Sequence, residues 1–127
     1  MTYILALDQG TSSSRALLYD AAGTVVASAQ QSIDSSYPHD GWVEQDPEMI
    51  WSSILQVGRQ AIASASIEPT DIAAIGITNQ RETSLLWERQ TSHCLYNAIV
   101  WQDRRSAAFC EQLAERGVGG APAPPPR

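Results

Sequence analysis

Tyr3-Ile-Leu-Ala-Leu-Asp-Gln-Gly-Thr-Ser-Ser-Ser-Arg15 is the stretch from which we predict the fold. Its first five residues are continuously apolar, which is typical of a strand buried on both faces of a sheet. The polar residues 8–14 then predict a turn, and Arg15–Tyr19 predicts a second strand. Another turn at 20–23 leads to a third strand at Thr24–Ser28. Three strands joined by such short turns form an antiparallel meander.

A helix is expected after the polar and aromatic loop at 37–45. Asp46 is a suitable N-cap, and Pro47 falls at the first helical position, where its missing N–H costs nothing. Apolar residues then recur at helical spacing, at Ile50, Ile54, Val57 and Ala61. The helix therefore has one apolar face to bury.

Three further strands are expected along the chain, at Ile72–Thr78, Ser84–Trp87 and Leu95–Trp101, the first of them buried. The order β-β-β-α-β predicts an α/β fold with a mixed sheet that opens with an antiparallel β-meander. With a polar turn after the first strand, this order resembles the ribonuclease-H-like core, or actin-like ATPase core, of actin, heat-shock ATPases and sugar kinases. We expect this core to be incomplete.

The last part of the chain predicts a second helix and a tail. Asp103 is suited to cap a helix that runs to Arg116 and stops at Gly117. The residues 117–127 contain glycines and prolines without periodicity, which predicts a disordered tail. The folded domain is therefore expected to span 1–116.

The composition restricts the classes of function. The 127 residues carry a net charge of −6, with 43% hydrophobic and 17% charged residues, as in a globular domain. An acidic chain has no electrostatic reason to bind nucleic acid or an anionic membrane. No signal peptide or membrane span is visible, so a cytoplasmic setting is expected. Cys94 and Cys110 match no metal or redox spacing and are expected to be buried thiols.

The first motif with a chemical interpretation runs from Asp8 to Arg15. A strand delivers the Asp8 carboxylate, and Gly10 lets the backbone approach a ligand closely. The hydroxyl and N–H groups that follow suit phosphate oxygens, and Arg15 adds a positive charge. Asp8 could hold Mg²⁺ through water. A solvated hairpin turn capped by Asp8 explains these eight residues equally well, so the motif alone leaves both interpretations open.

Two later motifs suit a polyol. Arg81 and Glu82 follow a predicted strand, and together they offer donors and an acceptor to a hydroxyl group. Trp101 ends another predicted strand and offers an apolar wall to the carbon face of a small polyol. Taken alone, the first pair is more simply explained as surface charges and the tryptophan as a core residue. A fourth motif, Gly41–Pro47, predicts only a loop that leads into a helix.

Four segments together resemble the glycerol kinases of the FGGY carbohydrate kinase family in order and approximate spacing. These segments are Asp8–Arg15, Gly41–Pro47, Ile75–Thr83 and Tyr96–Trp101. The resemblance runs from about Tyr3 to about Arg116. In that family, the Asn-Gln-Arg-Glu-Thr segment at 79–83 separates glycerol kinases from relatives that act on xylulose, ribulose or gluconate.

The resemblance implies an enzyme that transfers the γ-phosphate of ATP to a terminal hydroxyl of glycerol with the help of Mg²⁺. The implied site residues are Thr11, Ser12, Ser13 and Arg15 for the nucleotide phosphates, Asp8 for Mg²⁺, and Arg81, Glu82 and Trp101 for glycerol. The family's catalytic aspartate has no counterpart in this sequence, so no catalytic base is assigned. The chain is therefore expected to be an amino-terminal fragment without activity of its own, and its oligomeric state stays open.

Other functions remain open at this point. One is another FGGY sugar kinase, against which Arg81 and Glu82 argue. A second is a domain that binds phosphate or a nucleotide without turnover. A ribonuclease-H-like nuclease is more remote, because it would need several clustered carboxylates, and Asp8 alone lies at a suitable strand end.

Overall fold

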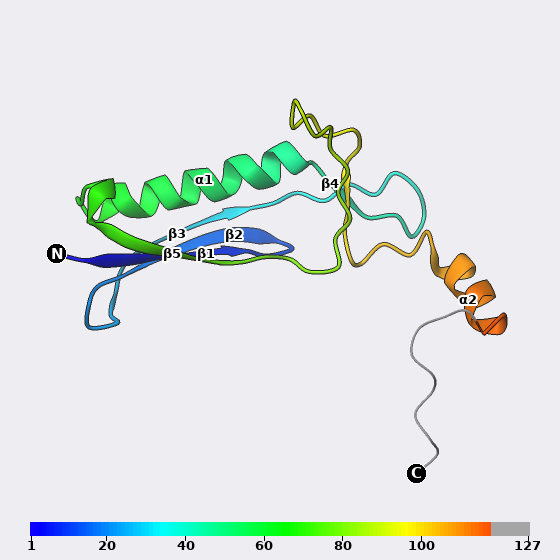
Figure 1. Ribbon diagram of the computed structural model, residues 1–127, viewed down its shortest axis with the longest axis horizontal. Helices are drawn as coiled ribbons and strands as arrows, with labels where there is room; N and C mark the ends of the chain where they lie inside the picture. Colours follow the sequence, from blue (N-terminus) through cyan, green and yellow to red (C-terminus); the bar gives the residue numbers. More distant parts are fainter. Residues whose placement is uncertain (118–127) are drawn as a thin grey trace, which may run out of the picture.

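The computed structural model describes residues 1–117. Its elements are, in chain order, β1 (Tyr3–Gln9), β2 (Ser13–Tyr19), β3 (Val25–Ser32), β4 (Glu44–Gln45), α1 (Pro47–Ser64), a 3₁₀ turn (Pro69–Asp71), β5 (Ile72–Thr78), β6 (Ala98–Ile99) and α2 (Ala107–Glu115). The long helix α1 lies along one face of a sheet formed by β1, β2, β3 and β5, and α2 stands apart from this layer pair (Figure 1). The predicted order β-β-β-α-β is confirmed for the main sheet and α1, while the two-residue strand β4, which was not predicted, lies between β3 and α1.

The main sheet is mixed, with the strand order β3-β2-β1-β5. β1 pairs antiparallel with β2, and β2 pairs antiparallel with β3, which confirms the predicted meander. β5 returns through α1 and pairs parallel with β1, with Asp8 beside Thr78. A parallel partner needs such a crossover, because the chain must return to the end of the sheet at which β1 begins. The carboxyl ends of β1 and β5 therefore lie side by side at the same end of the sheet.

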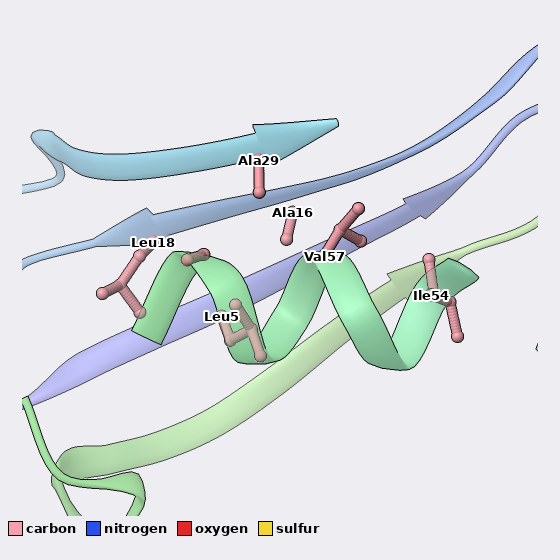
Figure 2. Close-up of a cluster of buried hydrophobic side chains, with 7 residues drawn as sticks. Leu5, Ala16, Leu18, Ala29, Ile54 and Val57 are labelled. Atoms are coloured by element: carbon pink, nitrogen blue, oxygen red, sulfur yellow. The ribbon is translucent and has the colours of Figure 1, made fainter. Parts of the chain in front are cut away.

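The core lies between α1 and the meander. Asp46 accepts a hydrogen bond from the Glu48 N–H through Oδ1 at 3.0 Å, so the expected N-cap is confirmed. Figure 2 shows the buried side chains that the helix and strands bring together: Leu5, Ala16, Leu18, Ala29, Ile54, Val57 and Ala61. Ile50, expected on the same helix face, is only half-buried. Burial of these side chains is what fixes α1 on the sheet.

The prediction that β5 is buried is wrong. β5 forms an edge of the described sheet, and all its residues but Ile72 are exposed, with Ile75 56% and Ile77 73% accessible. α1 packs on β1, β2 and β3, so it leaves β5 uncovered. The expectation for the first strand is also wrong in part, because one of its faces is open and Ile4 is 48% exposed there. An apolar run predicts a strand, but burial depends on what covers that strand.

The two short strands that follow are smaller than expected. β6 covers only Ala98–Ile99 of the predicted strand Leu95–Trp101, and it pairs antiparallel with β4. In place of the strand predicted at Ser84–Trp87, the structure has single bridges, from Ser84 to Ile99 and from Trp87 to Cys94. Residues 84–95 form a narrow loop that projects beside the amino end of α1 (Figure 1). Its side chains are largely exposed, so packing does not enforce a regular ladder.

The second helix begins later than expected. α2 spans Ala107–Glu115, with Ser106 rather than Asp103 at the N-cap position. Asp103 instead binds Arg105 by a short salt bridge, which keeps its carboxylate from the helix terminus. Gly117 has a φ of 70°, the left-handed conformation that glycine favours, so the expected helix stop is confirmed. The rest of the predicted tail, residues 118–127, lies outside the described residues.

Two further expectations concern the surface. Among residues 1–117, no helix has the length and apolar character needed to cross a membrane. Both cysteines are free thiols, but the prediction that they are buried is wrong: Cys94 is half-buried and Cys110 is exposed on α2. α2 has no buried residue in the described chain, which accounts for the exposure of its thiol.

Candidate functional site

A pocket of about 380 Å³ lies at the end of the sheet that is formed by the carboxyl ends of β1 and β5. Its lining comes from three separate segments of the chain, and consists of Asp8, Gln9, Gly10, Thr11, Asn79, Gln80, Arg81, Glu82 and Trp101. Polar side chains dominate this lining, and the tryptophan supplies its one large apolar surface. Strand ends of this kind are where α/β proteins commonly bind small ligands.

The turn at residues 10–12 joins β1 to β2 and has the properties of an anion site. The Gly10 N–H donates to the Ser13 carbonyl at 2.9 Å, and a Cβ at Gly10 would lie only 3.1 Å from that oxygen. The Thr11 and Ser12 N–H groups donate no backbone hydrogen bond within residues 1–117. Two adjacent free amides are suited to phosphate oxygens. The turn therefore fits a nucleotide phosphate.

Trp101 and Thr11 join the two sides of the pocket. The indole Nε1 of Trp101 donates a hydrogen bond to Oγ1 of Thr11 at 2.8 Å, across 90 residues of sequence. The indole is about half exposed, so one part of the ring remains open to the pocket. A ring in this position offers an apolar surface to a bound ligand.

Arg81 and Glu82 line the pocket on the side of β5, and both side chains are exposed. Glu82 has a φ of 56°, an uncommon value for a residue with a side chain. Such a conformation costs about 1–3 kcal/mol and persists only where the surrounding structure enforces it. Glu82 therefore holds this backbone conformation at a local cost in free energy.

Three of the predicted phosphate residues are outside the pocket lining. Ser12 is exposed on the turn, while Ser13 Oγ accepts a hydrogen bond from Gln30 Nε2 at 3.0 Å. Arg15 lies directly opposite Asp8 in the β1–β2 ladder, on the sheet face that α1 does not cover. The structure thus brings Asp8 and Thr11 into one pocket with Arg81, Glu82 and Trp101, and places Arg15 next to Asp8 on the open face.

The buried Glu44 is the centre of a partly exposed polar network that the sequence did not reveal. Its carboxylate accepts hydrogen bonds from Arg105 Nη2 at 2.7 Å, Tyr96 OH at 2.8 Å and Asn97 Nδ2 at 3.1 Å. Arg105 also binds Asp103 at 2.7 Å, and its guanidinium lies 3.9 Å from the centre of the Trp42 ring. This network holds the segments on both sides of Trp101.

The charged groups of the network stabilise one another in their ionised forms. Burial raises the pKa of Glu44, but the hydrogen bonds from Arg105, Tyr96 and Asn97 outweigh this effect and leave that pKa below its usual value. The hydrogen bond from Arg105 is the main reason why the pKa of Asp103 is lowered to about 2. The same bond raises the pKa of Arg105. All three groups are therefore ionised at neutral pH.

A magnesium–nucleotide complex fits the residues that are present. Asp8 has an exposed carboxylate and lines the same pocket as Thr11, whose N–H donates no backbone hydrogen bond within residues 1–117. Within the described residues, no group of three or more potential metal-binding side chains occurs. Mg²⁺ does not require such a group, since it keeps several waters and commonly uses one or two carboxylates together with substrate phosphates. Asp8 would hold the ion, and the turn would hold the phosphates.

The fold is that of an actin-like ATPase core, with a polar pocket where β1 and β5 end. A family model described as "FGGY family of carbohydrate kinases, N-terminal domain" matches residues 3–121. The chain belongs to the FGGY family of carbohydrate kinases.

Curated relatives are similar over almost the whole chain. A glycerol kinase from Paraburkholderia phytofirmans is 58% identical over 116 residues, which are 91% of this chain and 23% of that protein. A glycerol kinase from Chromobacterium violaceum is 55% identical over 117 residues, or 92% of this chain and 23% of the relative. The chain therefore spans about a quarter of the length of the curated relatives that it matches.

Solved structures confirm the fold. Plasmodium falciparum glycerol kinase with ADP superposes with a TM-score of 0.82 at 32% identity, over 91% of this chain and 23% of that chain. A gluconate kinase from Lactobacillus acidophilus gives a TM-score of 0.84 at 26% identity, over 92% and 23% of the two chains. The predicted mixed sheet of an actin-like ATPase core is thereby confirmed.

Proposed function

We propose that this chain supplies the nucleotide-phosphate turn and part of the acceptor pocket of an ATP-dependent glycerol kinase. The reaction is transfer of the γ-phosphoryl group of ATP to a terminal hydroxyl of glycerol, which gives glycerol 3-phosphate. One observation carries this proposal: a single pocket is lined by Asp8 and Thr11 on one side and by Arg81, Glu82 and Trp101 on the other. The identity of 58% to a protein named glycerol kinase supports the same reaction.

The turn, Arg15 and two residues of the pocket lining each have a role in this proposal. The free amides of Thr11 and Ser12, with the Thr11 hydroxyl, bind phosphate oxygens, and Arg15 adds positive charge near Asp8. Bound Mg²⁺ neutralises charge on the transferred phosphoryl group. Two groups orient the acceptor hydroxyls: the Arg81 guanidinium donates to them, and the Glu82 carboxylate accepts from them. We assign no catalytic base, and we place the protein in the cytoplasm with no nucleic-acid partner.

Another FGGY sugar kinase is the second candidate. Xylulose kinase from Lactobacillus acidophilus superposes with a TM-score of 0.85, so the backbone alone does not separate the acceptors. Its sequence identity of 25% is less than half of the 58% found for the Paraburkholderia glycerol kinase. Arg81 and Glu82, in the segment that resembles glycerol kinases, therefore favour glycerol. A domain that only binds nucleotide remains the non-catalytic alternative.

A chimera tests the proposal. In it, this chain replaces the matching quarter of the Paraburkholderia phytofirmans protein, and glycerol-dependent ADP release is measured. We expect activity within about tenfold of the unaltered relative, and a loss of at least about 100-fold with Arg81→Ala, since misplacing a bound reactant has costs of that order. Arg59→Ala, on the exposed side of α1, is the matched control. Higher activity on xylulose or gluconate than on glycerol would reject the proposed acceptor.

The 127-residue chain alone provides a second measurement. It brings a phosphate turn, a metal-associated carboxylate and part of an acceptor pocket to one place, but phosphoryl transfer also needs a positioned base and exclusion of water. We expect no glycerol-dependent ADP release above background in a coupled assay of the purified chain. Turnover that Arg81→Ala abolishes would show that the described pocket is sufficient for the reaction.

A further inference from the structure

Gln45 lies at the meeting point of the two sides of the pocket without lining it. This residue ends β4, in the motif from which the sequence predicted only a loop, and it is 1% exposed. Its Nε2 donates to the Thr11 carbonyl at 2.7 Å and to Ser35 Oγ at 3.0 Å. Its Oε1 accepts a hydrogen bond from Gln80 Nε2 at 2.9 Å. One buried amide thus binds three segments: the turn at residues 10–12, which we call the phosphate turn, the loop after β3 at Ser35, and residues 80–82, which we call the acceptor segment.

The orientation of both glutamine amides follows from the Thr11 carbonyl. A carbonyl oxygen only accepts, so the Gln45 amide must turn its Nε2 towards Thr11 and its Oε1 towards Gln80. Gln80 must then donate with its own Nε2. Its Oε1 is left buried without a partner within the described residues. The amide of Gln80 is therefore held in the orientation that Gln45 requires, although this leaves an acceptor unsatisfied.

The hydrogen bond between Gln45 and Gln80 also affects the two residues that follow Gln80. Gln80 directly precedes Arg81 and Glu82, and Glu82 holds its left-handed backbone conformation there. Arg81 and Glu82 are exposed, and the bond from Gln80 to Gln45 is a buried anchor directly before them. The same Gln45 amide holds the phosphate turn at Thr11. The positions of the two ligand-binding segments are therefore linked through one side chain.

We infer that Gln45 is a positioning residue that holds the phosphate turn and the acceptor segment in a fixed relative position. A ligand that binds to one of these segments therefore changes the environment of the other. The roles of the two segments rest on the proposed function, but the mechanical link does not. The inference therefore has two readouts, one that needs no ligand and one that does.

The first readout is the backbone order parameter S², measured by ¹⁵N relaxation on the 127-residue chain. Gln45→Met keeps the side-chain length but removes all three hydrogen bonds. We expect S² to fall from about 0.85 to below about 0.6 at residues 11–12 and at 80–82 together, with α1 unchanged. Ser35→Ala, which removes only one of these bonds, should leave both segments ordered. Loss of order in only one segment, or equally in α1, would overturn the inference.

A second variant guards against simple misfolding. Gln45→Glu reproduces the bonds to Thr11 and Gln80, but not the donation to Ser35, and only while its carboxyl is protonated, because the neutral acid donates to the Thr11 carbonyl and accepts from Gln80. Burial favours the neutral acid, so we expect S² in both segments to match the unaltered chain near pH 5 and to fall near pH 8. Disorder that is independent of pH would contradict the positioning role.

The ligand readout uses Mg·ATP as the probe. In the unaltered chain, we expect Mg·ATP to shift the amide resonances of the turn and also those of Gln80–Glu82. In Gln45→Met, we expect shifts in the turn alone. Shifts in both segments of the variant would overturn the inference. If the unaltered chain shows no shift with Mg·ATP, the proposed function fails, while the ligand-free order parameters still decide the role of Gln45.

Discussion

The indole nitrogen of Trp101 donates its hydrogen to the hydroxyl oxygen of Thr11, at a distance of 2.8 Å. The bond joins the apolar wall of the acceptor side to the turn that fits a phosphate. Because the Thr11 oxygen is the acceptor in this bond, its own proton remains available to a ligand oxygen. A substitution of Trp101 is therefore expected to weaken the binding of nucleotide as well as the binding of the proposed polyol substrate.

Trp101→Phe tests this relationship. Phenylalanine keeps the apolar wall but cannot donate, so the Thr11 hydroxyl loses the bond that orients it. We expect Mg·ATP to bind about 2- to 10-fold more weakly by calorimetry, since one hydrogen bond contributes about 0.5–1.5 kcal/mol. Trp51→Phe, at an exposed position of α1, is the control and should bind normally. Unchanged binding by the Trp101 variant would mean that the bond does not orient the turn.

The buried hydroxyl pair Ser14 and Ser53 is expected to respond unequally to substitution. The two oxygens lie 2.7 Å apart, and Ser53 Oγ also donates to the Ile50 carbonyl at 2.8 Å, so the proton between the two serines comes from Ser14. Ser53→Ala leaves the fully buried Ser14 hydroxyl without an acceptor and should cost about 1–3 kcal/mol. Ser14→Ala leaves the bond to Ile50 intact and should cost less.

Urea denaturation of the two single variants and of the double variant measures this asymmetry. The double variant should lose less than the sum of the single losses, because the two residues share one hydrogen bond. Additive losses, or a larger loss from Ser14→Ala, would contradict the assigned direction of the bond.

Stability should fall in acid because of Asp103. Its pKa in the folded chain is about 2, below its ordinary value of 3.8, so its contribution is complete above about pH 4 and is lost as pH falls towards 2. Asp103→Asn should remove about 1–2 kcal/mol of the free energy of unfolding at pH 7, and should flatten its decline between pH 4 and pH 2. Denaturant midpoints measured across this range test it, with the exposed Asp34→Asn as control. An equally steep decline in both variants would exclude Asp103 as its source.

The open edge of β5 should cause self-association. Seven residues without a charge or a proline present unpaired backbone groups there, and Ile77 is 73% exposed. Exposed edges of this kind pair with other chains. Ile77→Lys should lower the associated fraction severalfold in sedimentation velocity, because a charge at the edge opposes pairing. Val26→Lys, on the opposite edge strand β3, is the matched control. An equal effect of both changes would point to general solubility instead.

Local patterns predicted much of this fold and most of the pocket. The strand from Tyr3, the turn expected at residues 8–14 and the cap at Asp46 each depend on neighbours in sequence, and each was found, although the turn is shorter and covers only residues 10–12. The chemistry of Arg81 and Trp101 left simpler explanations open, and the family resemblance assigned both to one site; the structure has both in the lining of one pocket. The strands expected between 84 and 101 were too long, since their regularity depends on packing that an exposed segment lacks.

The sequence by itself determined the order of elements and the chemistry available at each strand end, because turns, caps and apolar periodicity act over a few residues. Only the tertiary structure decided which side chains are buried and which polar groups meet. β5 is as apolar as β1, but it lies beyond the reach of α1 and stays exposed. Gln45 resembled a loop residue until the fold brought Thr11 and Gln80 to its amide, across 34 and 35 residues of chain. Such contacts are set by packing between distant segments, and no local pattern encodes them.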